Sequence, residues 1–223
     1  MDCVQSHVSW MSANATLCGG EADLAGPTPW AFVPAEKTMH ILFPDAVTTS
    51  DIAAVVAKAD VFGAASSALW FAEDKEAPEI DGLGFERGWQ PWWMESRPRD
   101  IAPGATDRVR LVTRVRPHDQ GRSQLLTDDD IMLAEGQVDG QYAGRAWMIV
   151  KDGIAGLYDV KVWPPFRRLG VGRELVTVLA AAASRREARV ITLNATPEGA
   201  TLYASCGFAM LGEGRTYWRH RHH

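Results

Sequence analysis

The chain has 223 residues, 46% of them hydrophobic and 23% charged, which predicts a packed globular protein of one large or two small domains. A net charge of −5 argues against nucleic acid as the main partner. No apolar run approaches the length of a membrane span, and no secretory signal is visible. Three cysteines without metal-ligand spacing predict no metal site and a reduced, cytoplasmic protein.

The first 97 residues predict a small α/β unit. Val4, Val8 and Met11 mark one face of a helix over residues 3–17, which ends at Gly19-Gly20. A second helix begins near Thr49-Ser50-Asp51, whose side chains suit a helix N-terminus. Strands are predicted at 30–33, 39–43, 67–71 and 84–94. Residues 98–107, which are rich in proline and glycine, are the predicted linker.

The second half, residues 108–219, begins with a strand over 108–113. Thr127 followed by three aspartates predicts a helix start, because carboxylates favour that end of a helix. A long hairpin joins strands 142–150 and 154–162 through Asp152-Gly153, a strong turn signal. A helix over 169–186, a strand over 189–194 and a short helix over 197–205 follow. Strands 207–211 and 215–218 are predicted to form a closing hairpin, and residues 220–223 a tail.

The turn between strand 154–162 and helix 169–186 suits an anion. The first turn of a helix has backbone N–H groups without partners, and Gly170 and Gly172 lack the Cβ atoms that would keep a phosphate away. Arg167, Arg168 and Arg173 add positive charge beside the helix dipole. The turn matches neither the Walker loop nor the dinucleotide-binding fingerprint. An ordinary strand-turn-helix packed through its glycines is the plainer interpretation.

Together with Asn194, Leu202-Tyr203 and Cys206-Gly207-Phe208, the pattern Arg167-x-x-Gly170-x-Gly172 resembles the GNAT superfamily of acyl-CoA-dependent N-acyltransferases. The resemblance covers about residues 108–218. It implies an α/β (α+β) fold with a mixed central sheet flanked by helices, preceded here by a smaller α/β half-domain. That half is either a degenerate copy of the same fold, as Leu83-Gly84-Phe85 suggests, or an unrelated extension. Without a phosphate loop, residues 1–97 should bind no second coenzyme.

The resemblance implies a coenzyme A site and one catalytic acid. Asn194 lies where two parallel strands should splay apart, and its amide would hold the coenzyme arm, or it is a simple turn residue. Tyr203 matches the tyrosine that the family often places beside the coenzyme sulfur, where a phenol can protonate a thiolate. A packing role for its ring is the alternative. The expected coenzyme-binding residues are Val160, Lys161, Val162, Arg167, Arg168, Gly170, Val171, Gly172, Arg173 and Asn194.

The general base and the acceptor site are less determined. Asp159 and Glu198 are the two candidate bases, acting through water, or else are structural. A helix start is the favoured explanation of the aspartates, and the functional alternative is that Asp128, Asp129, Asp130 and Glu135 are ligands for a cationic acceptor. Cys206 is expected to be a buried, inert thiol.

These observations favour an N-acetyltransferase that uses acetyl-CoA and a small primary amine, such as an aminoglycoside-like or polyamine-like cation. The alternatives are a protein N-terminal or lysine acetyltransferase, a non-catalytic acyl-CoA sensor, and an interaction module that uses the tryptophan-rich segment 89–93. No membrane or nucleic-acid partner is expected, and the protein should be a monomer or homodimer.

Overall fold

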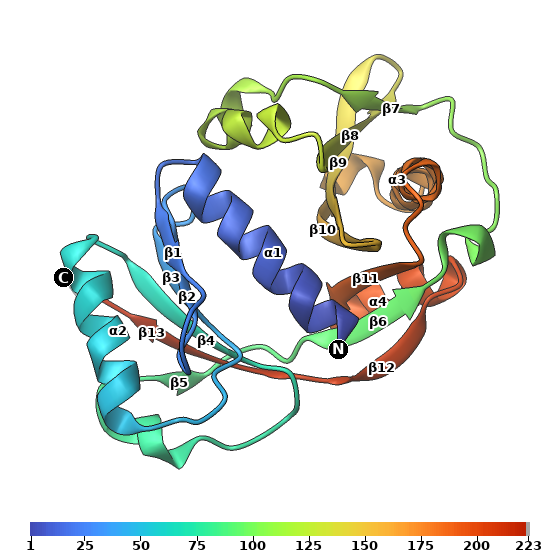
Figure 1. Ribbon diagram of the computed structural model, residues 1–223. Coiled ribbons are helices and arrows are strands. Elements are labelled where there is room, and N and C mark those ends of the chain that lie inside the picture. The colour runs from blue at the N-terminus through green and yellow to red at the C-terminus, as the bar shows by residue number, and fades with distance from the viewer. Residues whose placement is uncertain (222–223) are drawn as a thin grey trace. The chain divides into compact units, whose positions relative to one another are not determined.

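The computed structural model describes residues 1–221, which form two compact units (Figure 1). Unit 1 comprises Met1–His7 and Trp92–Leu211, and unit 2 comprises Val8–Pro91 and Gly212–His223. The division therefore does not coincide with the predicted linker at 98–107. Residues 222–223, the end of the predicted tail, lie outside the described residues, and His220 belongs to a strand.

Unit 1 is built on a seven-stranded sheet in the order β12-β6-β11-β10-β9-β8-β7. Of the pairs β6–β11, β11–β10, β10–β9, β9–β8 and β8–β7, only β11–β10 is parallel, and the other four are antiparallel. The strands are β6 (Trp92–Ser96), β7 (Val109–Val112), β8 (Ile131–Val138), β9 (Gln141–Lys151), β10 (Ile154–Val162), β11 (Val190–Ala195) and β12 (Ala209–Glu213).

Helices cover both sides of this sheet. Helix α3 (Val171–Arg185) connects β10 to β11, and α4 (Pro197–Ser205) follows β11. The 3-10 segment η3 (Pro117–Thr127) lies on the side of the sheet away from α3 (Figure 1). Short 3-10 turns occupy η2 (Pro98–Asp100) and η4 (Pro164–Phe166). Leu175 and Leu179 of α3 pack against Met148 and Leu157 of the sheet to form the core. Burial of these side chains is the main stabilising term for the unit.

The hairpin and crossover elements were predicted correctly. Asp152 and Gly153 both have positive φ, which a tight two-residue hairpin turn requires. Helix α3 begins directly after Gly170, whose φ of +87° an L side chain rarely adopts. Thr196 caps α4 by accepting a hydrogen bond from the Gly199 N–H at 3.2 Å, as expected of a threonine before a helix-opening proline.

Unit 2 repeats this arrangement on a smaller scale. Its sheet has the order β1-β2-β3-β4-β13-β5, with β3 and β4 parallel and α2 (Thr49–Val61) between them in the chain. The strands are β1 (Glu21–Asp23), β2 (Trp30–Val33), β3 (Thr38–Leu42), β4 (Ser66–Phe71), β5 (Glu86–Arg87) and β13 (Arg215–His220). Helix α1 (Asp2–Leu17) begins in unit 1 and continues into unit 2, and η1 (Pro78–Leu83) completes the elements.

The predicted closing hairpin is wrong, because its two strands belong to different sheets. Strand β12 lies beside β6, whereas β13 pairs with β4 and β5. Each sheet thus contains a strand from the other half of the sequence: β6 next to β11 in unit 1, and β13 next to β4 in unit 2. The predicted strand 84–94 accordingly divides into β5 and β6.

The helix start predicted at Asp128-Asp129-Asp130 is also wrong. The aspartates form a turn after η3, in which the Asp128 carboxylate accepts a hydrogen bond from the Asp130 N–H at 2.9 Å, and strand β8 begins at Ile131. A short acidic side chain stabilises such a turn as readily as a helix end. Among the described residues, no helix is long and apolar enough to cross a bilayer.

Candidate active site

The glycine-bearing turn before α3 forms one wall of a pocket of about 410 Å³. Arg168 and Gly170 both have positive φ, which reverses the chain so that the first turn of α3 borders the pocket. The Arg167 Nε donates to the Val162 carbonyl at 3.1 Å and anchors the turn to β10. The opposite wall is α4, through Glu198, Thr201, Leu202 and Ser205. Unpaired helix N–H groups and two arginines on one wall suit a diphosphate.

A Cβ atom at Gly172 would lie 3.0 Å from Leu202 Cδ2 and 3.6 Å from Val162 Cγ2. Any side chain at this position would therefore narrow the space between the two walls. The glycine keeps the pocket open beside the helix N-terminus, so the residues present fit a phosphate-bearing ligand such as coenzyme A.

The second feature is the divergence of β10 from β11. Their parallel pairing covers only Ile154 to Gly156, and beyond it β10 remains paired with β9 alone. The β9–β10 register shifts between Tyr158 and Lys161, where Asp159 has a φ of +48°. Such a bulge redirects the strand and leaves backbone groups unpaired. An extended ligand can therefore pair with the end of β10, on the edge that β11 leaves.

A second pocket, of about 400 Å³, occupies this divergence. It is lined by Val160 and Lys161 of β10 and by Gly199 and Tyr203 of α4. Both pockets share Val162, Arg167, Glu198 and Leu202, so one surface leads from the glycine turn to Tyr203. Among the predicted coenzyme-binding residues, those from Val160 to Arg173 line one or both pockets; the exception is Asn194.

Asn194 faces a different environment. Its side-chain nitrogen lies 3.3 Å from His7 Nδ1 of α1, within unit 1. Its neighbours Leu193 and Ala195 point into the core on the α3 side. The predicted contact of Asn194 with the coenzyme arm therefore has no support from its position. Next to it, the hydroxyls of Ser6 and Tyr158 are 2.7 Å apart, and burial raises the pKa of Tyr158.

Tyr203 lies at the inner end of the second pocket and is 9% exposed. Its ring meets Phe208 edge to face at 5.8 Å between centroids. Burial raises the pKa of its phenol, so the group stays protonated at neutral pH. A buried, protonated hydroxyl beside the end of β10 is placed as a general acid requires.

The two candidate bases have different surroundings. Asp159 Oδ2 accepts hydrogen bonds from Arg145 at 2.6 Å and from Arg122 at 2.9 Å, so two arginines hold this carboxylate. Glu198 is exposed and lines both pockets. Position therefore favours Glu198 over Asp159 as a base that works through water, and it favours an ion-pairing role for Asp159.

Arg173 also differs from its expected role. Its guanidinium donates to the Ser205 carbonyl at 2.8 Å and to the Ser205 hydroxyl at 3.0 Å, which ties α3 to the end of α4. Arg108 donates from both Nε and Nη2 to Oε1 of the buried Glu174 in the first turn of α3. These two arginines hold the walls of the pocket, and Arg167 and Arg168 are the other two cations that line it or its turn.

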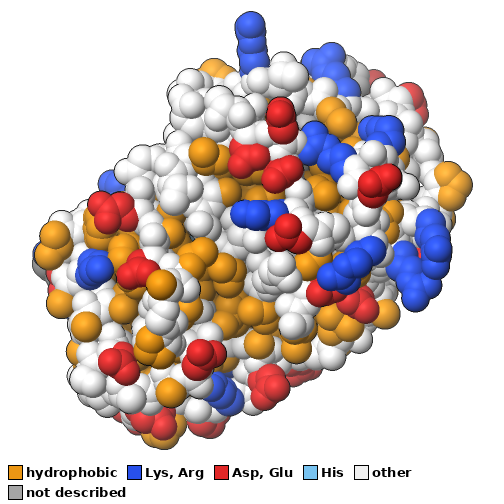
Figure 2. All heavy atoms as spheres, in the orientation of Figure 1, with side chains coloured by type: hydrophobic (Ala, Val, Ile, Leu, Met, Phe, Trp, Pro, Cys, Tyr) orange, Lys and Arg blue, Asp and Glu red, His pale blue; other side chains and the backbone are white. Residues whose placement is uncertain are grey.

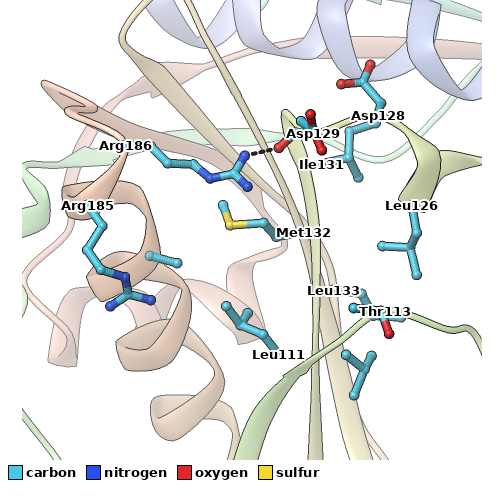
Figure 3. A pocket seen from close by; sticks show the side chains of 12 residues that line it. Leu111, Thr113, Leu126, Asp128, Asp129, Ile131, Met132, Leu133, Arg185 and Arg186 are labelled. Carbon is cyan, nitrogen blue, oxygen red and sulfur yellow. Dashed lines mark hydrogen bonds between the residues drawn. The ribbon is translucent and has the colours of Figure 1, made fainter.

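The predicted acceptor ligands are separated by the structure. Asp128 and Asp129 line another pocket, of about 380 Å³, with Arg185 and Arg186 at the C-terminal end of α3 (Figure 3). The Asp129 carbonyl accepts a hydrogen bond from Arg186 there. The glycine turn is at the other end of this helix, about 22 Å away at 1.5 Å per residue. The three aspartates of the Asp128–Asp130 turn are thus not part of the pockets described above.

Glu135 lies toward the other end of β8. It is buried, accepts from Arg116 Nε at 3.0 Å, and is paired in register with Arg145 of β9. Sequence reasoning missed Arg116, Arg145 and the Met1–His7 segment, because their contacts join residues far apart in the chain.

The comparisons agree with this geometry. Residues 127–210 match the acetyltransferase (GNAT) domain family. A GCN5-related N-acetyltransferase from Kribbella flavida superposes with a TM-score of 0.66 at 14% identity, covering 99% of this chain and 95% of that one. A GNAT-family acetyltransferase from Novosphingobium aromaticivorans DSM 12444 gives 0.61 at 15% identity, covering 99% and 96%. A tandem GNAT protein from the clavulanic acid biosynthesis pathway gives 0.55 at 13%, covering 86% and 78%. No curated protein matches the sequence.

A mixed sheet with one parallel strand pair joined through a helix, present in both units, is the fold that the chain shares with these structures. Residues 127–210 thus form a region that matches the GNAT acetyltransferase domain family.

Proposed function

We propose that this protein transfers an acetyl group from acetyl-CoA to the amino group of a primary amine. The observation that carries the proposal is the continuous surface formed by the two pockets, with the glycine turn at one end and Tyr203 at the other. One end suits a diphosphate, the middle presents a strand edge, and the far end presents a protonated phenol. The donor would supply the thioester that reacts and the thiol that leaves.

The residues of this chain would act in a fixed order along that surface. The α3 N-terminus, Arg167 and Arg168 bind the anionic end of the donor. The open edge of β10 positions its extended arm, which converts an encounter in solution into a reaction within a complex. Glu198 receives the amine proton through water, and Tyr203 gives its proton to the departing thiolate. A proton then returns to the phenolate from solvent.

A cationic acceptor was expected because of Asp128–Asp130, which lie at the opposite end of α3 from the glycine turn. Glu135, the remaining carboxylate, is engaged by Arg116. We therefore propose that the acceptor is a primary amine that need not carry any further positive charge. A cytoplasmic location is part of the proposal and rests on the three cysteine thiols.

The test is an assay of thiol release from acetyl-CoA in the presence of a panel of amines, which should include a polyamine, an aminoglycoside, free amino acids and a lysine-containing peptide. Mass spectrometry should then find the acetylated amine. Release of thiol that depends on an amine supports the proposal. Tight binding of acetyl-CoA without transfer to any amine would instead indicate the non-catalytic sensor.

A further inference from the structure

Three aromatic side chains from three separate elements meet beside the end of β10. His118 of η3, Tyr142 of β9 and Trp163, which follows β10, have ring centroids 5.6 to 6.1 Å apart. The side chain of His118 is 46% exposed, and Tyr142 and Trp163 are half-buried. We call these three residues the aromatic wall. None of the three belongs to the two described clusters of buried hydrophobic side chains, so the wall is a partly exposed aromatic surface outside those clusters.

Two cations lie over the rings of this wall. Arg116 Cζ is 4.0 Å from the centroid of the Tyr142 ring, and Lys161 Nζ is 4.7 Å from the centroid of the Trp163 ring. Both distances are within the range of cation–π attraction. Lys161 also lines the pocket that contains Tyr203. The aromatic wall therefore borders the place where the acyl group would be transferred.

The carboxylates on this side of the sheet are already engaged. Glu135 accepts from Arg116 Nε, and Asp159 accepts from Arg122 and Arg145. Asp119 pairs with Arg145 and lies 3.1 Å from His118 Nε2. Each of these three carboxylates is therefore paired with at least one arginine.

Positively charged side chains outnumber carboxylates beside the aromatic wall. Three carboxylates (Asp119, Glu135, Asp159) stand against four permanent cations (Arg116, Arg122, Arg145, Lys161), a net charge of +1 with His118 neutral. Within the described chain, Lys161 has no carboxylate at ion-pairing distance, and Arg116 uses only its Nε in a hydrogen bond. In Figure 2, basic and acidic side chains are interspersed over the upper part of the view rather than separated by sign. The positive charge that no carboxylate neutralises therefore lies on Lys161 and on the Nη groups of Arg116.

We propose that the acceptor is a primary amine that also carries a carboxylate, as amino acids do, and that Lys161 and Arg116 recognise this carboxylate against the aromatic wall. This inference rests on the proposed function. The wall excludes water from one side of the ion pair, which strengthens the attraction. Lys161 provides a point charge, and the Arg116 fork provides two parallel N–H donors. A polyamine would bring further positive charge to a site that already has an excess.

The inference is tested with matched acceptors in the presence of saturating acetyl-CoA. The probes are L-tryptophan, L-tryptophanamide, tryptamine and spermidine, and the measured quantity is kcat/KM. We expect L-tryptophan to exceed its amide and tryptamine by roughly 10- to 100-fold, the range of a charge-assisted hydrogen bond. Equal or faster acetylation of the amide, tryptamine or spermidine would overturn the inference while leaving the proposed function intact.

A variant separates recognition of the carboxylate from general damage. Lys161→Met keeps the length of an exposed side chain and should reduce the ratio of kcat/KM for L-tryptophan to kcat/KM for its amide by about tenfold or more, whatever its effect on the rate that the two probes share. Lys151→Met, at the distant hairpin end of β9, is the matched control and should alter neither rate. An equal loss for both probes in Lys161→Met would overturn the assignment. If no probe is acetylated although acetyl-CoA binds, both the proposed function and this inference fail.

Discussion

The proposed chemistry depends most on the hydroxyl group of Tyr203. Tyr203→Phe removes it and retains the edge-to-face packing on Phe208. A positioned acid contributes about 10²- to 10⁴-fold to rate, so we expect turnover to fall by that range while acetyl-CoA affinity and melting temperature stay close to those of the unaltered protein. Turnover is measured where chemistry limits the rate.

The control for this variant is Tyr217→Phe, which removes a hydroxyl that donates to the Lys75 carbonyl in unit 2. It should leave turnover per folded molecule unchanged. Near-normal turnover of Tyr203→Phe would mean that water protonates the thiolate. Because burial raises the pKa of Tyr203 above its ordinary value of about 10, its proton should be present throughout the neutral range. The unaltered enzyme should therefore show no loss of turnover from this group below about pH 10.

The same pKa shift has a consequence for stability. The protonated phenol is favoured in the folded protein, so its contribution is complete below the unfolded pKa of about 10 and is lost as pH rises through the higher folded value. Melting temperature should thus fall above about pH 10, and it should fall less steeply in Tyr203→Phe. Parallel curves for the two proteins in thermal scans from pH 8 to 11 would contradict this.

Arg145 joins two carboxylates beneath η3. Its side chain is 9% exposed and pairs with Asp119 and Asp159. Removing one partner of a buried ion pair strands the other charge, so Arg145→Met should lower the free energy of unfolding by about 3–5 kcal/mol. Urea unfolding measures this. Arg189→Met, which breaks an exposed pair with Asp2, should cost at most about 1 kcal/mol. Similar losses in the two variants would show that the Arg145 pairs are not buried in solution.

The three thiols should differ in reactivity. Cys3 and Cys206 are each 2% exposed, and burial raises the pKa of Cys3 to about 11 and also raises that of Cys206. The thiolate is the reactive form, so both should react slowly at neutral pH. Cys18, of intermediate exposure, should react first with a thiol reagent in the native protein. Rapid modification of all three before unfolding would contradict the burial of Cys3 and Cys206.

At the scale of elements, the turn between β10 and α3 is the feature with the sharpest test. Gly170→Val places a β-branched side chain at a φ of +87°, at the N-terminus that should receive the diphosphate. Gly140→Val is the matched control, because Gly140 has a φ of +75° and nothing within 4 Å of its missing Cβ. Both should be destabilised by about 1–2 kcal/mol, the cost of a left-handed backbone with a side chain.

Only Gly170→Val should lose affinity for acetyl-CoA, as measured by calorimetric titration. Equal affinity in both variants would remove the turn from the binding site. A loss of affinity in Gly140→Val comparable to that in Gly170→Val would mean that general destabilisation, and not the site, is responsible.

The elements that the sequence predicted well are those whose signal is local. The 151–153 turn, the amphipathic helix α3 and the glycines at 170 and 172 each depend on neighbours a few residues away. The family resemblance over the second half is confirmed by the match at residues 127–210. The division of β12 and β13 between two sheets was not predictable, because strand pairing depends on distant partners such as β4 and β6.

The site was predicted in part for the same reason. The pocket-lining residues between Val160 and Arg173 are close together in the chain, so a local pattern indicates them. The aromatic wall combines residues 118, 142 and 163, whose individual positions carry no chemical signal. The helix start predicted at Asp128–Asp130 is wrong because a run of aspartates suits a turn as well as a helix start. The Asn194 side chain reaches His7 from the other end of the chain, which no local pattern indicates.

At the scale of the whole molecule, the two units share a strand arrangement but differ where the coenzyme would bind. In unit 2, β3 and β4 pair in register from Thr38 to Leu42, so no divergence opens between them. Helix α2 begins after Thr48, whose side chain satisfies the Asp51 N–H at 3.2 Å. Within the described residues of unit 2, the capped helix start and the closed strand pair therefore provide no counterpart to the site in unit 1.

The most direct test of this account is therefore a calorimetric titration of the full chain with acetyl-CoA, which measures stoichiometry and affinity together. The account predicts one molecule of acetyl-CoA per chain, with binding abolished by Gly170→Val. Two equivalent sites per chain, or no binding at all, would contradict it.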